Sequence, residues 1–321
     1  MPLYPDIEPF NSGMLDVGDG NRVYWEVCGN PQGKPAVVLH GGPGSGCAPG
    51  WRRFFDPDAY RIVLFDQRGC GRSTPHASDP STDLATNTTR HLVEDLEHLR
   101  GSLGIKRWLI FAGSWGTTLA LAYGQRHRAH VSEMVLFSIT TTSRAEVEWV
   151  TRQAGRFFPD AWEHFRDGVS PEDRSGSLVD AYARLLHHPS PVIREKAAKD
   201  WCAWEDAHVA LRPDHRPDPR YNDPQFRMAF ARLVTHYWRH AAWLEDGLLL
   251  REAAKLAGVP GVLLHGRLDR SSPPDIAWAL ARAWPGSELT LVHGAGHGAA
   301  DAGMNARLAE ATDCFSRGDQ S

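Results

Sequence analysis

A chain of 321 residues is long enough to bury a full hydrophobic core, as one large domain with an insertion or as two modest domains. Its formal net charge of -4, with acidic and basic residues mixed along the chain, argues against a nucleic-acid-binding protein and against a polybasic membrane anchor. The five cysteines form no C-x-x-C pair, the N-terminus lacks a signal-peptide pattern, and no apolar run approaches the roughly 20 residues of a membrane span, so we expect a cytoplasmic protein.

The first predicted elements are the strands of a hairpin. Residues 14–27 form two alternating segments on either side of Asp19-Gly20, a dipeptide typical of tight hairpins. The apolar runs 36–39 and 61–65 are continuous, as in parallel strands that are buried on both faces. The pattern therefore predicts a sheet that starts antiparallel and continues as parallel strands with right-handed crossovers.

Glycine-rich loops follow both of these runs. Residues 66–73 match neither G-x-G-x-x-G nor a Walker pattern, so we interpret this loop as structural rather than phosphate-binding. Beyond it, apolar residues at helical spacing predict a helix over residues 88–103.

The most informative stretch is residues 108–123. An apolar run breaks at Gly113-Ser114-Trp115-Gly116 and continues with helical periodicity, which indicates a strand, a sharp turn and a helix. This is the pattern of a nucleophile elbow, with Ala112 at the position where G-x-S-x-G usually has its first glycine. A chance serine in a glycine-rich turn is the alternative when the motif is taken alone.

Two downstream segments favour the elbow. Residues 261–269 predict a buried strand that delivers Asp269 to a loop, and residues 289–297 deliver His297 in the same way. The order Ser114, Asp269, His297 is that of an α/β-hydrolase triad. His293 is a competing candidate for the base, and we prefer His297 because His293 falls inside the strand-end run.

Residues 139–258 differ from the rest of the chain. They contain no clear strand but many aromatic residues at helical spacing, and a proline-rich and charged connector, residues 212–220, divides them. We therefore predict a hydrolase domain of residues 1–138 and 259–321, with a helical cap of residues 139–258 inserted over the strand ends. Such a cap would control which substrates reach the serine.

The predicted chemistry is nucleophilic catalysis. His297 would take the proton of Ser114, and Asp269 would hold the imidazole in the required tautomer. The backbone N–H groups of Trp115 and Gly42 are our candidates for an oxyanion hole, with Gly41 as the fallback. We predict no cofactor and no metal: His236 and His240 have helical metal-ligand spacing, but no third ligand is evident, so ordinary packing or surface roles are preferred.

Several longer segments stand out, among them His40-Gly-Gly-Pro-Gly, Asp66-Gln-Arg-Gly, Gly113-Ser-Trp-Gly, Trp201-Cys-Ala-Trp-Glu205 and Gly294-Ala-Gly-His297. With them the chain resembles the prolyl aminopeptidases, also called proline iminopeptidases, over nearly its whole length. The resemblance implies an α/β-hydrolase fold, release of N-terminal proline from peptides, and an amine-binding role for Glu205 with Trp201 and Trp204 beside it. Taken alone, Glu205 also fits a solvated residue on an amphipathic helix.

This chain departs from the family pattern at two positions of the substrate pocket. Val234 stands where the family often has a second glutamate, and Phe137 stands where an arginine often follows the strand. The triad is not affected, so the catalytic class is better supported than the substrate. Four other acids could compensate for the missing one: Glu146, Glu148, Glu245 and Asp246.

Three functions remain open on the sequence. The first is a serine exopeptidase that acts on small peptides with N-terminal proline. The second is an esterase or amidase that uses the same triad on small or natural-product acyl groups and needs no free amine. The third is a non-catalytic binding protein on a hydrolase scaffold, which the complete triad disfavours. The sequence indicates no nucleic-acid or membrane partner and leaves the oligomeric state open.

Overall fold

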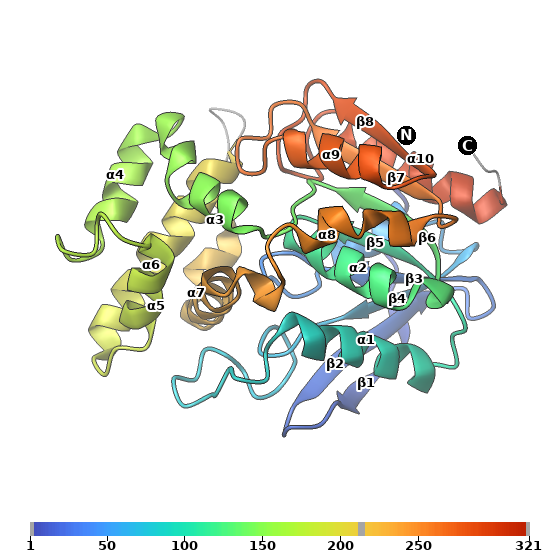
Figure 1. Cartoon of the computed structure of the whole chain (residues 1–321). Coiled ribbons are helices and arrows are strands. Elements are labelled where there is room, and N and C mark those ends of the chain that lie inside the picture. The colour runs from blue at the N-terminus through green and yellow to red at the C-terminus, as the bar shows by residue number, and fades with distance from the viewer. Residues whose placement is uncertain (1–2, 211–215, 319–321) are drawn as a thin grey trace.

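The computed structural model describes residues 3–210 and 216–318, and at its centre lies an eight-stranded sheet in the order β1-β2-β4-β3-β5-β6-β7-β8 (Figure 1). The predicted hairpin is confirmed: β1 and β2 pair antiparallel, β2 also pairs antiparallel with β4, and the remaining pairs are parallel. The strands are β1 (Pro9–Asp16), β2 (Arg22–Gly29), β3 (Lys34–Leu39), β4 (Tyr60–Phe65), β5 (Trp108–Gly113), β6 (Val131–Phe137), β7 (Gly261–Gly266) and β8 (Ser287–Val292).

Successive residues of the central strands are buried on opposite faces of the sheet, which explains their continuous apolar sequences. Val37 and Leu39 of β3 belong to the core under one helical layer, whereas Ala36 and Val38 belong to the core on the other face. The first layer contains α1 (Thr89–Ser102), α2 (Trp115–Arg126) and α9 (Asp275–Ala283); the second contains η1 (Pro49–Phe54) and α10 (Met304–Arg317) (Figure 1).

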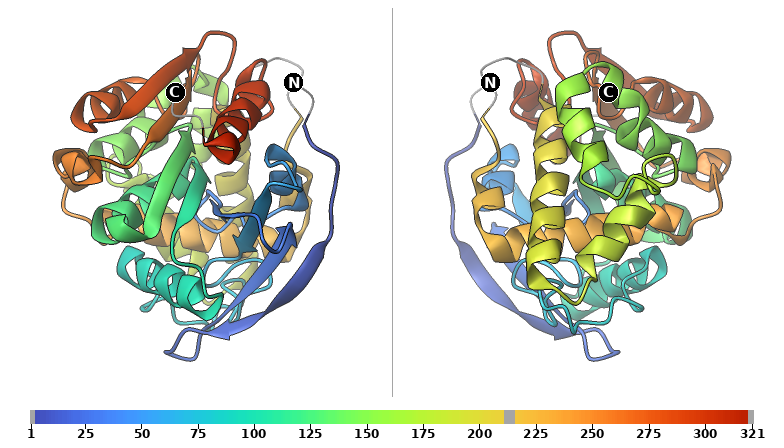
Figure 2. Two further views of the ribbon diagram at one scale, coloured as in Figure 1. Left: turned by 90° about the vertical axis from the view of Figure 1, so that its right-hand side faces the viewer. Right: turned by 90° about the vertical axis from the view of Figure 1, so that its left-hand side faces the viewer.

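Helices between β6 and β7 pack on one another around a separate aromatic core. Phe165 stacks on Tyr182 with ring centroids 4.6 Å apart, and it also contacts Trp201 and Trp204. These helices face the viewer in the right-hand view of Figure 2. They are α3 (Arg144–Thr151), α4 (Pro159–Asp167), α5 (Leu178–Leu186), α6 (Pro191–Val209) and α7 (Pro224–Arg239), with the short turns η3 (Gln153–Arg156) and η4 (Pro219–Asn222).

Within the described part of residues 139–258 the regular elements are all helical, as the sequence predicts. Residues 212–215 of the predicted connector lie outside the described residues. The last elements of this range, α8 (Leu248–Arg251) and η6 (Ala253–Leu256), pack against α2 and α9 and share the core of the first helical layer. The division of the chain at residues 138 and 259 stays a prediction, and this packing groups residues 248–256 with the sheet rather than with the cap helices.

Two further turns complete the regular elements, η2 (Arg128–His130) and η5 (Ala241–Trp243). No helix in the described part of the chain is long and apolar enough to cross a membrane. All five cysteines are free thiols.

The junction between β5 and α2 leaves no room for a side chain at Gly116. A Cβ atom there would lie 2.3 Å from the carbonyl oxygen of Leu39 in β3, which is a backbone atom of the sheet. The close approach of helix and strand fixes where α2 begins, immediately after Ser114.

We therefore expect Gly116→Ala to lower the free energy of unfolding by about 1–3 kcal/mol, because the new methyl group must displace backbone. The matched control is Gly101→Ala near the end of α1, where an added Cβ meets nothing within 4 Å. This control should leave stability unchanged or raise it by up to about 1 kcal/mol. Denaturant unfolding measures both, and equal effects would contradict the packing argument.

Candidate active site

Ser114 occupies a strained turn between β5 and α2. Its φ of 55° and ψ of -134° lie in a region that side-chain-bearing residues rarely adopt. Its backbone N–H donates to the carbonyl of Phe137 at the end of β6, 3.1 Å away, which ties the turn to the neighbouring strand. The elbow that the sequence predicts is therefore present, and its serine faces a cavity.

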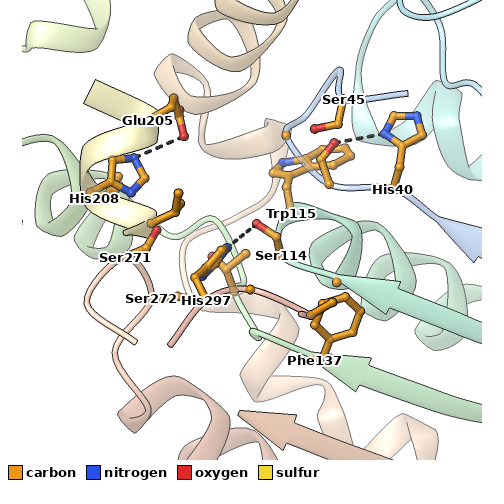
Figure 3. A pocket seen from close by; sticks show the side chains of 18 of the residues that line it. His40, Ser45, Ser114, Trp115, Phe137, Glu205, His208, Ser271, Ser272 and His297 are labelled. Carbon is orange, nitrogen blue, oxygen red and sulfur yellow. Dashed lines mark hydrogen bonds and ion pairs between the residues drawn. The ribbon is translucent and has the colours of Figure 1, made fainter. Parts of the chain in front are cut away.

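The structure brings the predicted serine, histidine and aspartate together. His297 Nε2 lies 2.9 Å from Ser114 Oγ (Figure 3), and His297 Nδ1 lies 2.8 Å from Asp269 Oδ2. His293 is exposed at the end of β8 and does not take part in this hydrogen-bond chain. The competition between the two histidines is thus decided by geometry in favour of His297.

Burial and charge act in opposite directions on the aspartate and the histidine. Burial disfavours the carboxylate of Asp269, but the positive charge and hydrogen bond of His297 outweigh it and hold the pKa of Asp269 below its usual value. Burial likewise disfavours the imidazolium, but the charge and hydrogen bond of Asp269 raise the pKa of His297. The backbone N–H of Ser272 donates to Asp269 Oδ1 at 2.8 Å, which satisfies the second carboxylate oxygen.

The loop that carries His297 is held by three further hydrogen bonds, which involve the side chains of Asp301 and Ser138. Asp301 Oδ2 accepts hydrogen bonds from the backbone N–H groups of Gly296 and Gly298, at 2.8 and 3.2 Å. The Ser138 hydroxyl donates to the carbonyl of His297 at 2.8 Å. These hydrogen bonds fix the backbone around His297 and so the position from which its imidazole reaches Ser114.

The predicted oxyanion donors border the same space. Trp115 is the first residue of α2, where a backbone N–H has no partner within the helix. Gly41 and Gly42 line the cavity, and a Cβ added to Gly41 would lie 3.6 Å from Ser114 Oγ, so this loop passes directly beside the serine. Gly42 has a φ of 108°, which favours glycine.

His40, which sequence reasoning did not single out, braces this loop. Its Nδ1 lies 3.0 Å from the Gly41 carbonyl, and its Nε2 accepts the backbone N–H of Gln67 at 3.1 Å. The Gln67 side chain donates in turn to the His40 carbonyl at 2.9 Å. Burial lowers the pKa of His40 and so keeps the ring neutral, as this pair of contacts requires. The Asp66-Gln-Arg-Gly loop thus supports the candidate oxyanion hole.

A cavity of about 1090 Å³ extends from Ser114 toward the cap helices. Glu205 of α6 lines it and is only 8 % exposed (Figure 3). Its Oε1 accepts the indole N–H of Trp201 at 3.1 Å, and its Oε2 lies 3.2 Å from Nε2 of the buried His208. Glu205 is therefore a held, nearly buried carboxylate rather than a solvated residue on an outer helix face.

The remaining predicted pocket residues lie elsewhere. Trp201, Trp204 and Val234 are fully or almost fully buried in the aromatic core of the cap helices and do not line the cavity. Trp201 reaches the site only through its hydrogen bond to Glu205, and Trp204 donates to the carbonyl of Val150 at 3.1 Å. Trp201 and Trp204 lie on α6 and Val234 lies on α7, and all three side chains pack between the cap helices instead of facing the cavity.

The four acids that could replace a second glutamate are used or placed otherwise. Glu146 lines the cavity, but its two oxygens accept hydrogen bonds from Thr140, Thr141 and Ser143 and so cap α3. The other three do not line the cavity: Glu148 lies 3.6 Å from Arg152, Glu245 pairs with Arg251, and Asp246 accepts the backbone N–H of Arg144.

Residues of both candidate cation clusters make other contacts. His236 lies 3.0 Å from the Asn87 carbonyl, and both His236 and His240 pack against Trp243. Among the described residues, Glu97, His127 and His130 have ligand atoms close enough to share a metal ion. Arg100 binds both oxygens of Glu97, at 2.9 and 2.8 Å, so a guanidinium already occupies the position of a cation.

The chain is similar to known proteins over nearly its whole length. A family profile described as "alpha/beta hydrolase fold" matches residues 34–302. The chain is 54% identical over 322 residues to a probable proline iminopeptidase of Streptomyces coelicolor, covering 99% of each chain. It is 47% identical over 315 residues to the proline iminopeptidase of Xylella fastidiosa strain Temecula1, covering 98% of this chain and 99% of the relative.

Solved structures support the same fold. The crystal structure of a proline iminopeptidase from Mycobacterium smegmatis has a TM-score of 0.62 and 20% identity, with 97% of this chain and 99% of that chain covered. VinJ has a TM-score of 0.63 and 20% identity over the same shares of the two chains. Given the matching profile, the full-length relatives and the fold, the chain belongs to the proline iminopeptidase family of α/β hydrolases.

Proposed function

We propose that this protein is a serine exopeptidase that releases proline from the free N-terminus of peptides through an acyl-enzyme. The observation that carries the proposal is the hydrogen-bond chain Ser114–His297–Asp269. Ser114 and His297 line the same cavity as the nearly buried carboxylate of Glu205. The names of the relatives, proline iminopeptidases at 47% and 54% identity, support the same activity. In this proposal the cap helices α3–α7 restrict access to the serine.

The reaction begins when Ser114 Oγ attacks the carbonyl carbon of the N-terminal residue and its proton passes to His297 Nε2. The backbone N–H groups of Trp115 and Gly42 receive the developing oxyanion. His297 then gives the proton to the leaving peptide nitrogen, and the C–N bond breaks. Water, deprotonated by the same imidazole, hydrolyses the prolyl ester and restores Ser114.

Glu205 is the group that would select a free amine. An N-terminal proline carries a positively charged secondary ammonium, and a carboxylate inside an apolar cavity attracts this charge more strongly than one in water. The hydrogen bond from Trp201 fixes the carboxylate before substrate arrives. Acylation of the substrate nitrogen would remove the charge and leave Glu205 without a partner.

One observation favours a second candidate function. Val234 is an apolar residue buried in the core of the cap helices, and Phe137 presents an aromatic ring to the cavity, so neither position supplies a charge for binding a substrate amine. A site without charges at these two positions also suits an esterase or amidase that accepts uncharged acyl groups. Substrate comparison separates the two functions.

Labelling of Ser114 tests whether the protein is catalytic at all. A fluorophosphonate probe should label the folded protein, since the activated hydroxyl attacks phosphorus, and Ser114→Ala should abolish labelling while the circular dichroism spectrum stays the same. An unlabelled, folded wild-type protein would instead support a non-catalytic binding role.

Glu205→Gln tests the amine anchor. We expect kcat/KM for a prolyl arylamide to fall about 30-fold or more, because a buried partner of the substrate charge is lost. Turnover of a simple aryl ester should change little. The matched control is Glu148→Gln on α3, which lies outside the cavity and should leave both activities in place. Equal losses on amide and ester, or equal rates on the prolyl arylamide and its N-acetylated form, would remove the assigned role.

The pH dependence follows from the pKa of His297. Only the neutral imidazole can accept the serine proton, so activity should fall as pH drops through a pKa that Asp269 raises above its ordinary value. In Asp269→Asn the attraction is gone while burial remains, so the imidazole should titrate at lower pH, and kcat should fall about 1,000- to 10,000-fold.

Nuclear magnetic resonance of ¹³C-labelled histidine follows this titration directly. His293→Gln is the control, because the side chain of His293 is exposed and lies outside the triad. The activity of this variant should fall at the same acidic pH as that of the wild type. An unchanged titration midpoint of His297 in Asp269→Asn would contradict the electrostatic account.

A further inference from the structure

The cavity continues past Ser114 on the side away from Glu205. Figure 3 shows Glu205 and Phe137 on opposite sides of the serine. Phe137 belongs there to a group of aromatic side chains that we call the aromatic wall: Trp51, Phe54 and Phe137. The centroid of the Trp51 ring lies 5.8 Å from those of both Phe54 and Phe137. All three residues line the cavity, and Trp51 is only partly buried, so part of its ring is available to a ligand.

The aromatic wall and the loop that follows His297 line the same cavity. Ala299 of this loop packs into the same hydrophobic cluster as the three aromatic residues, and residues 298–301 also line the cavity. The Glu205 end is different, because Phe230 and Trp238 there belong to the cap core. The two ends of the cavity are therefore built from separate hydrophobic clusters on either side of the serine.

The direction of proton transfer indicates which part of the substrate lies at each end of the cavity. The imidazole of His297 must reach the nitrogen of the leaving group in order to protonate it, so the leaving group lies next to the His297 loop. The prolyl residue, held through its ammonium by Glu205, lies toward the cap. This assignment rests on the proposed exopeptidase function.

We propose that the aromatic wall is the subsite for the second residue of the peptide and that it selects an aromatic or large aliphatic side chain. This residue is the first residue of the leaving group, which departs before the proline. The wall carries no charge of its own. Asp301, the acid that lines the cavity in the nearby loop, is engaged by the backbone N–H groups of Gly296 and Gly298. A large apolar side chain gains ring contacts and loses water there, whereas glycine at this position leaves the wall exposed.

The experiment compares prolyl-phenylalanine amide with prolyl-glycine amide, both uncharged at the C-terminus. We expect kcat/KM to be about 10- to 100-fold higher for the phenylalanine substrate. Trp51→Ala should reduce this preference several-fold. Trp278→Ala is the matched control, because Trp278 is exposed on α9 and does not line the cavity, and it should retain the wild-type preference.

A measurement on the wild-type enzyme covers the case in which Trp51→Ala fails to fold. Free phenylalanine amide, the product that leaves first, should inhibit prolyl arylamide hydrolysis at a lower concentration than glycine amide. Equal kcat/KM for the two prolyl amides, or equal inhibition by the two product amides, would overturn the subsite while leaving the exopeptidase function standing. Cleavage of neither prolyl amide would overturn the proposed function itself, and this subsite with it.

Discussion

The contact between Asp269 and His297 is the interaction on which the rest of the site depends. Burial disfavours the charged form of this carboxyl group, but the adjacent imidazole, with smaller contributions from His265 and the Ser272 N–H, holds the pKa of Asp269 below its usual value. The ionised carboxylate in turn holds the ring at hydrogen-bond distance from Ser114. The Ser272 N–H holds Asp269, and Asp301 holds the loop of His297. Both contacts matter because a small rotation of the His297 imidazole would break its contact with Ser114.

The serine itself is placed by a different constraint, the close packing of α2 on β3. Gly116 allows the helix to approach the strand, and the strained backbone of Ser114 points its hydroxyl out of the turn. The helix start also leaves the Trp115 N–H free of an intrahelical partner, next to the loop that His40 braces. Nucleophile and candidate oxyanion donors therefore come from one piece of local geometry.

The cavity around this serine has two chemically distinct ends. The cap supplies a held carboxylate, Glu205, with His208 beside it, whereas the sheet side supplies Trp51, Phe54 and Phe137. Glu146 caps α3, and Val234 is an apolar residue in the core of the cap helices. Glu205 is therefore the carboxylate that we assign to binding a substrate amine at the end of the cavity near the cap helices. A substrate with a positive amine and an apolar leaving group matches both ends at once.

The amino-acid sequence by itself determined a sheet that starts antiparallel and continues as parallel strands, the hairpin around Asp19-Gly20, the elbow at Ser114, and Asp269 and His297 as candidate partners of this serine. These features are local: hydrophobic periodicity, turn residues and short motifs act over about ten residues, and such patterns can be read along a chain. The tertiary structure showed that the preferred histidine, His297, does reach the serine. Only the tertiary structure decided that Trp201, Trp204 and Val234 pack in the core of the cap helices and that Glu146 caps α3. It also revealed His208 beside Glu205 and the aromatic wall, whose members lie on η1 and β6 and give no shared signal in sequence. Side chains that meet across separate elements depend on how helices and sheet pack, and neither periodicity nor spacing along the chain specifies that contact.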